Sequence, residues 1–216
     1  MKLFSYFRSS ASYRVRIALN LKGLNYEQSA VHLLKNGGEQ FSEAYRQLNP
    51  ESLVPALVDG DETQALSQSL AIMEYLDEQY PDHPLLPQAA HDRAWVRSLA
   101  LAIACDIHPI NNLRVLKYLS GPLAVSDEQK NEWYRHWCAV GFASLETRLA
   151  NDSRRGLFCF GDQAGYADCV LIPQIFNAQR FNCDMSPYPT LMAINERCQA
   201  LPAFAAAHPS KQADAE

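Results

Sequence analysis

Apolar and polar side chains alternate along residues 2–6, which predicts a strand with one buried face. Farther along, Val15, Ala18 and Leu19 recur at the spacing of one helix face, and the helix that they predict ends at a glycine. A weaker alternation over residues 25–31 predicts a second strand. The chain therefore opens with a β-α-β unit, whose two strands should be parallel and joined by a right-handed crossover.

The next segments continue this small domain. Residues 33–49 are polar around a glycine pair and then place apolar side chains at helical spacing, which predicts a loop and a short helix. Short runs over residues 53–60 and 63–66 predict two more strands, although the first contains Pro55, which cannot donate to a sheet ladder. A helix with a buried apolar stripe is predicted over residues 67–80.

Three closely spaced prolines then exclude a continuous helix and mark a domain boundary. Beyond them the apolar spacing is helical, with a kink expected at Pro109 and a long helix over residues 128–149. The sequence therefore predicts an α/β domain over residues 1–82 and an all-helical domain over residues 88–212. The residues after Pro209 are polar, and we expect them to be frayed.

Composition and charge narrow the range of functions. A formal net charge of -5, with scattered arginines, gives no footprint for binding nucleic acid. The longest apolar run, residues 99–105, is far shorter than the ~20 residues that a membrane span requires, and the first residues lack the apolar core of a signal peptide. We therefore expect a soluble, cytoplasmic protein with neither a nucleic-acid nor a membrane partner.

The six cysteines are far apart in the sequence and form neither a C-x-x-C pair nor another metal-type spacing. We expect them to be buried, small apolar residues in a reducing compartment. The sequence thus predicts no metal site, and a thiolate used in chemistry would arrive with a cofactor.

Ser9, Ser10 and Ser12 stand where the first predicted strand gives way to the first helix. The start of a helix carries unpaired N–H groups and a partial positive charge, which stabilise an anion such as a thiolate. Serine is also a common helix cap, so these three residues on their own favour simple capping over a function.

The run S-S-A-S-Y-R-V-R-I-A-L from Ser9 to Leu19 resembles the active-site motif of zeta-class glutathione transferases, whose best-known members are maleylacetoacetate isomerases. The resemblance covers nearly the whole chain. It implies an N-terminal thioredoxin-like α/β domain that binds glutathione and a C-terminal all-helical glutathione-transferase domain. Ser9 and Ser10 would hold the glutathione thiolate. Ala11 also lies in this glutathione site, where the family has a cysteine.

The same resemblance implies further glutathione contacts. The Val54-Pro55 bond corresponds to the family's cis-proline, whose preceding backbone binds the cysteinyl group, although an arbitrary X-Pro bond is cis in only about 5–6% of cases. Gln68 and Ser69 open the next helix and would bind the γ-glutamyl carboxylate, with plain capping as the alternative. Gln40 is carried over from the family's loop motif.

Polar residues in the second domain complete the predicted site. The resemblance implies that His108, Asn112 and Arg114 contribute to the glutathione and substrate pocket, although a lone histidine is more often a core or surface residue. Arg8 and Arg180 are candidates for binding substrate carboxylates, because a planar guanidinium binds a carboxylate through two hydrogen bonds. A solvated surface arginine is the alternative for both.

The implied activity is glutathione-dependent cis–trans isomerisation of maleylacetoacetate to fumarylacetoacetate, in tyrosine and phenylalanine breakdown. Maleylpyruvate isomerase of gentisate breakdown is the close alternative, with the same chemistry on a shorter substrate. A glutathione transferase that consumes glutathione and a glutathione-binding protein without catalysis are alternatives from other classes. The family also implies a homodimer.

Overall fold

The computed structural model describes residues 1–60, 62 and 64–216, which form two compact units. The first unit comprises Met1–Leu85 together with Gln199–Glu216, and the second comprises Leu86–Cys198. The chain thus leaves the first unit within the proline-rich stretch and returns to it at residue 199.

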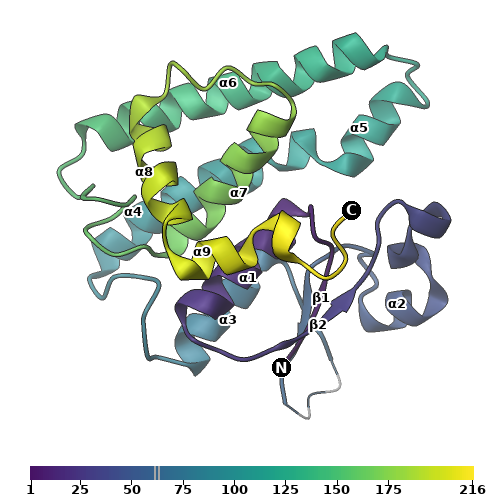
Figure 1. Ribbon diagram of the computed structural model, residues 1–216, viewed down its shortest axis with the longest axis horizontal. Coiled ribbons are helices and arrows are strands. Elements are labelled where there is room, and N and C mark those ends of the chain that lie inside the picture. The colour runs from purple at the N-terminus through teal and green to yellow at the C-terminus, as the bar shows by residue number, and fades with distance from the viewer. Residues whose placement is uncertain (61, 63) are drawn as a thin grey trace. The chain divides into compact units, whose positions relative to one another are not determined.

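This return differs from the sequence-based boundaries, which placed residues 199–212 in the second domain. Helix α9 (Pro202–Ala207), yellow in Figure 1, packs against the purple helix α1 (Ser10–Leu21). The side-chain amide of Asn20 donates to the Ala203 carbonyl at 2.9 Å. The last part of the chain therefore belongs to the first unit because it is hydrogen-bonded to the helix that begins at the serine run.

The first unit contains a four-stranded mixed sheet in the order β2-β1-β3-β4. Its strands are β1 (Lys2–Ser5), β2 (Glu27–Ala30), β3 (Ala56–Val58) and β4 (Leu66–Ser67). The parallel pairing of β1 with β2 confirms the prediction, and the other two pairings are antiparallel. Part of the fourth predicted strand, Thr63, lies outside the described residues.

Helices α1, α2 (Glu43–Leu48), α3 (Ser69–Gln79) and α9 belong to the same unit, with 3-10 turns at Lys35–Gly37, Glu39–Phe41 and Pro209–Lys211. The apolar stripes predicted for α1 and α3 form its core together with β1 and β3. Its fully buried side chains include Leu3, Ile17, Leu19, Leu57, Ile72 and Leu76.

Helices, joined by loops, make up the regular structure of the second unit, apart from an isolated β-bridge between Arg155 and Gly161. The unit contains α4 (Ala90–Leu101), a π-helical turn (Ala102–Ile107), a 3-10 turn (Pro109–Asn111), α5 (Leu113–Ser120), α6 (Asp127–Asn151), α7 (Tyr166–Arg180) and α8 (Pro189–Gln199). The predicted kink at Pro109 is a break, since the chain passes through the 3-10 turn before α5 begins. No helix in the described ranges is long and apolar enough to cross a membrane.

A buried guanidinium holds the loop between β1 and α1. Arg16 is fully buried, and it donates to the Ser5 hydroxyl at 3.0 Å, to the Tyr6 carbonyl at 3.4 Å and to the Phe7 carbonyl at 2.9 Å. Its Nε donates to the Ala207 carbonyl of α9 at 3.1 Å. Burial lowers the pKa of Arg16 to about 10, so the side chain stays charged at neutral pH.

Replacing this guanidinium should destabilise the first unit. Arg16→Met keeps much of the volume but leaves several buried oxygens without a donor, so we expect the free energy of unfolding to fall by at least about 3 kcal/mol. Urea denaturation followed by circular dichroism measures the loss. Arg46→Met, at an exposed position on α2, is the control and should change it by no more than about 0.5 kcal/mol. Equal losses in both variants would contradict the role assigned to Arg16.

Candidate active site

The serine run lies at the junction of β1 and α1. Ser9 is the N-cap of α1, and its Oγ accepts the Ser12 N–H at 3.2 Å. The capping alternative is therefore real, yet it uses only an acceptor position of the hydroxyl, whose proton can still be donated to an anion. Capping and thiolate binding are compatible at this residue.

The two serines of the predicted catalytic pair differ in exposure. Ser10 is the first residue of α1 and is only 3% exposed, whereas Ser9 is half-buried and precedes the helix. Ala11, in the first turn, is half-buried as well and adds no polar atom. Within this unit, Ser9 is the better placed hydroxyl for an incoming sulfur.

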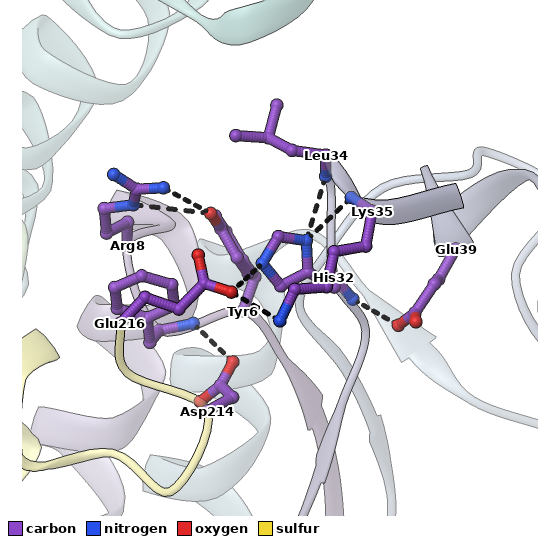
Figure 2. Close-up of polar contacts among 9 residues, drawn as sticks. Tyr6, Arg8, His32, Leu34, Lys35, Glu39, Asp214 and Glu216 are labelled. Atoms are coloured by element: carbon purple, nitrogen blue, oxygen red, sulfur yellow. Dashed lines mark hydrogen bonds and ion pairs between the residues drawn. The ribbon is translucent and has the colours of Figure 1, made fainter. Parts of the chain in front are cut away.

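Arg8 directly precedes the serine run and is half-buried. Its Nε and Nη2 donate to the Tyr6 hydroxyl at 3.3 and 3.0 Å, and its guanidinium lies 4.8 Å from the centre of the Phe7 ring. Figure 2 shows the guanidinium held beside the Tyr6 hydroxyl. Two neighbouring aromatic side chains thus orient a cation one residue away from Ser9.

The Val54-Pro55 bond is cis, as the resemblance implied. Val54 is buried, and the carbonyl of the preceding Leu53 accepts from the Tyr45 hydroxyl at 2.6 Å and from the Asn49 side chain at 2.9 Å. These bonds fix the backbone that precedes the proline, which is the segment expected to contact a cysteinyl group.

Gln68 and Ser69 lie at the start of α3, and simple capping does not describe them. Gln68 has a φ of 67° and makes no side-chain capping bond; its amide donates to the Glu51 carboxylate at 2.6 Å instead. Ser69 is already inside the helix and accepts from the buried Arg14 at 3.2 Å. Arg14 therefore links the N-terminal turn of α3 to α1.

Gln40 lies in the turn Glu39–Phe41 and is 5% exposed. Its Oε1 is buried without a hydrogen-bond partner among the described residues. Its amide group lies against Gly38, whose φ of 110° favours glycine and where a Cβ would displace the Gln40 side chain. A buried polar atom without a partner suits a ligand contact, because a protein seldom leaves one unsatisfied.

The remaining predicted residues belong to the second unit. His108 follows the π-helical turn, and Asn112 is the N-cap of α5, where its Oδ1 accepts the Val115 N–H at 3.2 Å. Arg114 is exposed in the first turn of α5. Arg180 is exposed at the end of α7 and donates to Asn177 at 2.8 Å.

The four buried cysteines offer no obvious nucleophile, whereas a hydrogen bond with Cys138 lowers the pKa of the partly exposed Cys183 thiol. Cys138, Cys159, Cys169 and Cys198 are buried as predicted, whereas Cys105 is exposed and Cys183 is half-exposed. Burial raises the pKa of the Cys159 and Cys198 thiols well above the ordinary value, which keeps both protonated. The described residues contain no cluster of side chains suited to a metal ion.

Several residues of this region were not identified from the sequence. Arg14 and Arg16 lie within the motif, on either side of the buried Val15. Two charged residues beside an apolar position of a helix were a sequence signal that they are buried and hydrogen-bonded. No sequence signal identified Glu51, Asp214 or His32. Their hydrogen-bond and ion-pair partners are either distant in the sequence or brought close by the conformation of a loop.

Comparisons with known proteins agree with this geometry. Residues 8–79 match the family model described as glutathione S-transferase, N-terminal domain. The chain is 54% identical, over 99% of its length and 97% of the relative's, to a probable maleylacetoacetate isomerase of Vibrio cholerae.

Two solved structures share the whole fold. One is a holo maleylpyruvate isomerase described as a bacterial zeta-class glutathione transferase, with a TM-score of 0.96, 47% identity and full coverage of both chains. The other is a maleylacetoacetate isomerase of Methylobacterium extorquens with bound malonate and glutathione, with a TM-score of 0.95, 42% identity and full coverage of both chains. This identity over the entire length shows that the chain belongs to the zeta class of glutathione transferases.

Proposed function

We propose that this protein is a glutathione-dependent cis–trans isomerase that converts maleylacetoacetate to fumarylacetoacetate. The observation that carries the proposal is Ser9 at the N-terminus of α1, with a hydroxyl proton available for a hydrogen bond and with Arg8 as the preceding residue in the chain. The relative of 54% identity is named for this reaction. We also infer a cytoplasmic homodimer, in keeping with the family.

The residues of the first unit fit glutathione. The α3 N-terminus suits its γ-glutamyl carboxylate, because the first N–H groups of a helix lack intrahelical partners, and Gln68, whose amide is bonded to Glu51, would contact it from the N-cap position. The backbone before Pro55 suits the cysteinyl group, and the buried Oε1 of Gln40 requires a donor that a bound ligand can supply. From the second unit, His108, Asn112 and Arg114 are proposed to complete the glutathione and substrate contacts.

Glutathione, when bound, would supply the thiolate nucleophile for reversible addition to the cis double bond. Ser9 would donate a hydrogen bond from its hydroxyl to that sulfur, and the partial positive charge of the α1 N-terminus would favour the anionic form. Arg8 and Arg180 bind the two carboxylates of the substrate and retain it while the bond rotates.

Maleylpyruvate isomerisation is the second candidate. A maleylpyruvate isomerase is similar to this chain over its full length at 47% identity, and the two substrates differ at a distance from the reacting bond. Parallel assays with maleylacetoacetate and maleylpyruvate rank the two by their kcat/KM.

Removing the Ser9 hydroxyl should impair turnover. By comparison with the loss of one donor from an oxyanion site, Ser9→Ala is expected to lower kcat by about 10²–10³-fold. It should also cost the helix cap about 1 kcal/mol, which thermal unfolding measures separately. The matched control is Ser10→Ala, which should retain most activity. The reverse ranking of the two variants would transfer the role to Ser10.

An isomerase returns glutathione in every cycle, which distinguishes it from a conjugating transferase. With maleylacetoacetate in large excess over glutathione, we expect complete conversion while the free thiol stays at its starting concentration. A thiol assay at the end of the reaction measures this. Thiol consumption in step with the substrate would instead identify a transferase, and absence of turnover with either maleyl substrate would favour a binding protein.

Replacing Arg180 should affect the substrate more than glutathione. Arg180→Gln removes the guanidinium from a carboxylate, and a hydrogen bond to a charged group is worth about 1.5–3 kcal/mol, so the KM for the dicarboxylate should rise about tenfold or more. The Kd for glutathione, from calorimetric titration, should be unchanged. An equal loss of affinity for both ligands would argue against a substrate-specific role.

A further inference from the structure

Residues 212–216 are docked on the loops that the proposed function assigns to glutathione. The sequence predicted a frayed tail here, and the structure contradicts this: Gln212 donates to the carbonyls of Ala206 and His208 at 2.9 and 2.8 Å. Figure 2 shows Asp214 and Glu216 directed at the first unit's loops from this segment.

Asp214 holds the loop that carries the serine run. Its Oδ2 accepts the Phe7 N–H at 3.0 Å, and its Oδ1 accepts from Gln28 at 3.4 Å. The carbonyl of the same Phe7 accepts from Arg16 at 2.9 Å. Both backbone polar groups of Phe7 are thus fixed by charged side chains, one residue before Arg8 and two residues before Ser9.

Glu216 holds the loop that leads to Gln40. The buried His32 ring accepts the N–H groups of Leu34 and Lys35 at its Nδ1, at 3.2 and 2.9 Å, so a neutral ring carries its proton on Nε2. That nitrogen faces the Glu216 carboxylate at 3.5 Å, and the Lys35 ammonium pairs with the same carboxylate. The hydrogen bond from Lys35 outweighs the opposing effect of burial and lowers the pKa of Glu216, which stays ionised.

We propose that the 212–216 segment is a positioning element of the active site, in which Asp214 sets the position of Arg8 and Ser9 while Glu216 ties that loop to the His32–Gln40 loop. The inference rests on the proposed function, because it concerns the loops assigned to glutathione. Neither carboxylate acts on the reacting atoms. A charged hydrogen bond to a backbone N–H is among the stronger ones, which suits Asp214 to fixing a loop.

The test compares Asp214→Ala with Asp214→Asn. The asparagine keeps an oxygen for the Phe7 N–H, whereas the alanine removes it. In Asp214→Ala we expect kcat to fall about ten- to a hundredfold, and the pKa of the bound glutathione thiol, followed by the ultraviolet absorbance of the thiolate, to rise. In Asp214→Asn, kcat and the pKa of the bound glutathione thiol should both lie close to the wild-type values. Asp184→Ala, which removes an exposed carboxylate that accepts the Ser186 N–H in the second unit, is the control and should match the wild type.

Glu216→Gln supplies an independent measurement if Asp214→Ala fails to fold. An exposed ion pair contributes up to about 1 kcal/mol, so the KM for glutathione should rise by up to about fivefold with kcat little changed. A lowered Tm with wild-type kcat and thiol pKa in the Asp214 variants would overturn the inference and leave the proposed function intact. A wild-type protein that forms no thiolate with glutathione would overturn the proposed function itself.

Discussion

The first unit depends on one buried guanidinium. Arg16 reaches the end of β1, the loop after it and the last turn of α9, so it joins segments from both ends of the described chain. A charge removed from water costs several kcal/mol unless its donors are satisfied. Here the satisfying groups are the Ser5 hydroxyl and the backbone carbonyls of Tyr6, Phe7 and Ala207, of which the Tyr6 carbonyl also accepts the Ser9 N–H. The loop conformation and the burial of Arg16 therefore depend on each other. Together they fix the position of Ser9, which follows the loop in the chain.

Two arginines of α1 hold the starts of two helices in place. Arg14 donates to Ser69 at the start of α3. Arg16 donates to the Phe7 carbonyl in the loop that leads to Ser9, the N-cap of α1. Each N-terminus offers unpaired N–H groups to an anion, and glutathione carries both a sulfur that ionises and a γ-glutamyl carboxylate. The chain itself brings no suitable sulfur to this motif, since Ala11 occupies the family's cysteine position and two of the buried thiols have raised pKa values. In the proposed mechanism the protein supplies hydrogen-bond donors and charges, and glutathione supplies the nucleophile.

Sequence patterns determined the local features. The alternation along β1, the apolar stripes of α1 and α3 and the serine run all depend on residues close together in the chain. The cis Val54-Pro55 bond was expected only from the family resemblance, because the residues themselves favour trans. A disturbance of the helix at Pro109 was also predicted, because proline lacks the N–H that a helix interior needs, although the sequence predicted a kink and the structure has a break. These features predicted the α/β domain and the helical domain, and the motif from Ser9 to Leu19 predicted the family.

Only the tertiary structure decided how the last residues are used. Phe7 and Asp214 are 207 positions apart, and Arg16 and Ala207 are 191 apart, so no periodicity in the sequence records their contact. A polar stretch such as residues 209–216 has the composition of a frayed tail, and it becomes ordered only where folded loops offer it an N–H, a histidine and a lysine. Likewise, the hydrogen bond between Gln68 and Glu51 joins residues 17 positions apart, and Gln68 has a positive φ of 67° between β4 and α3. The composition and spacing of residues determine which segments form helices and strands. The partners of buried or docked charged side chains are set only when distant segments pack together in the folded protein.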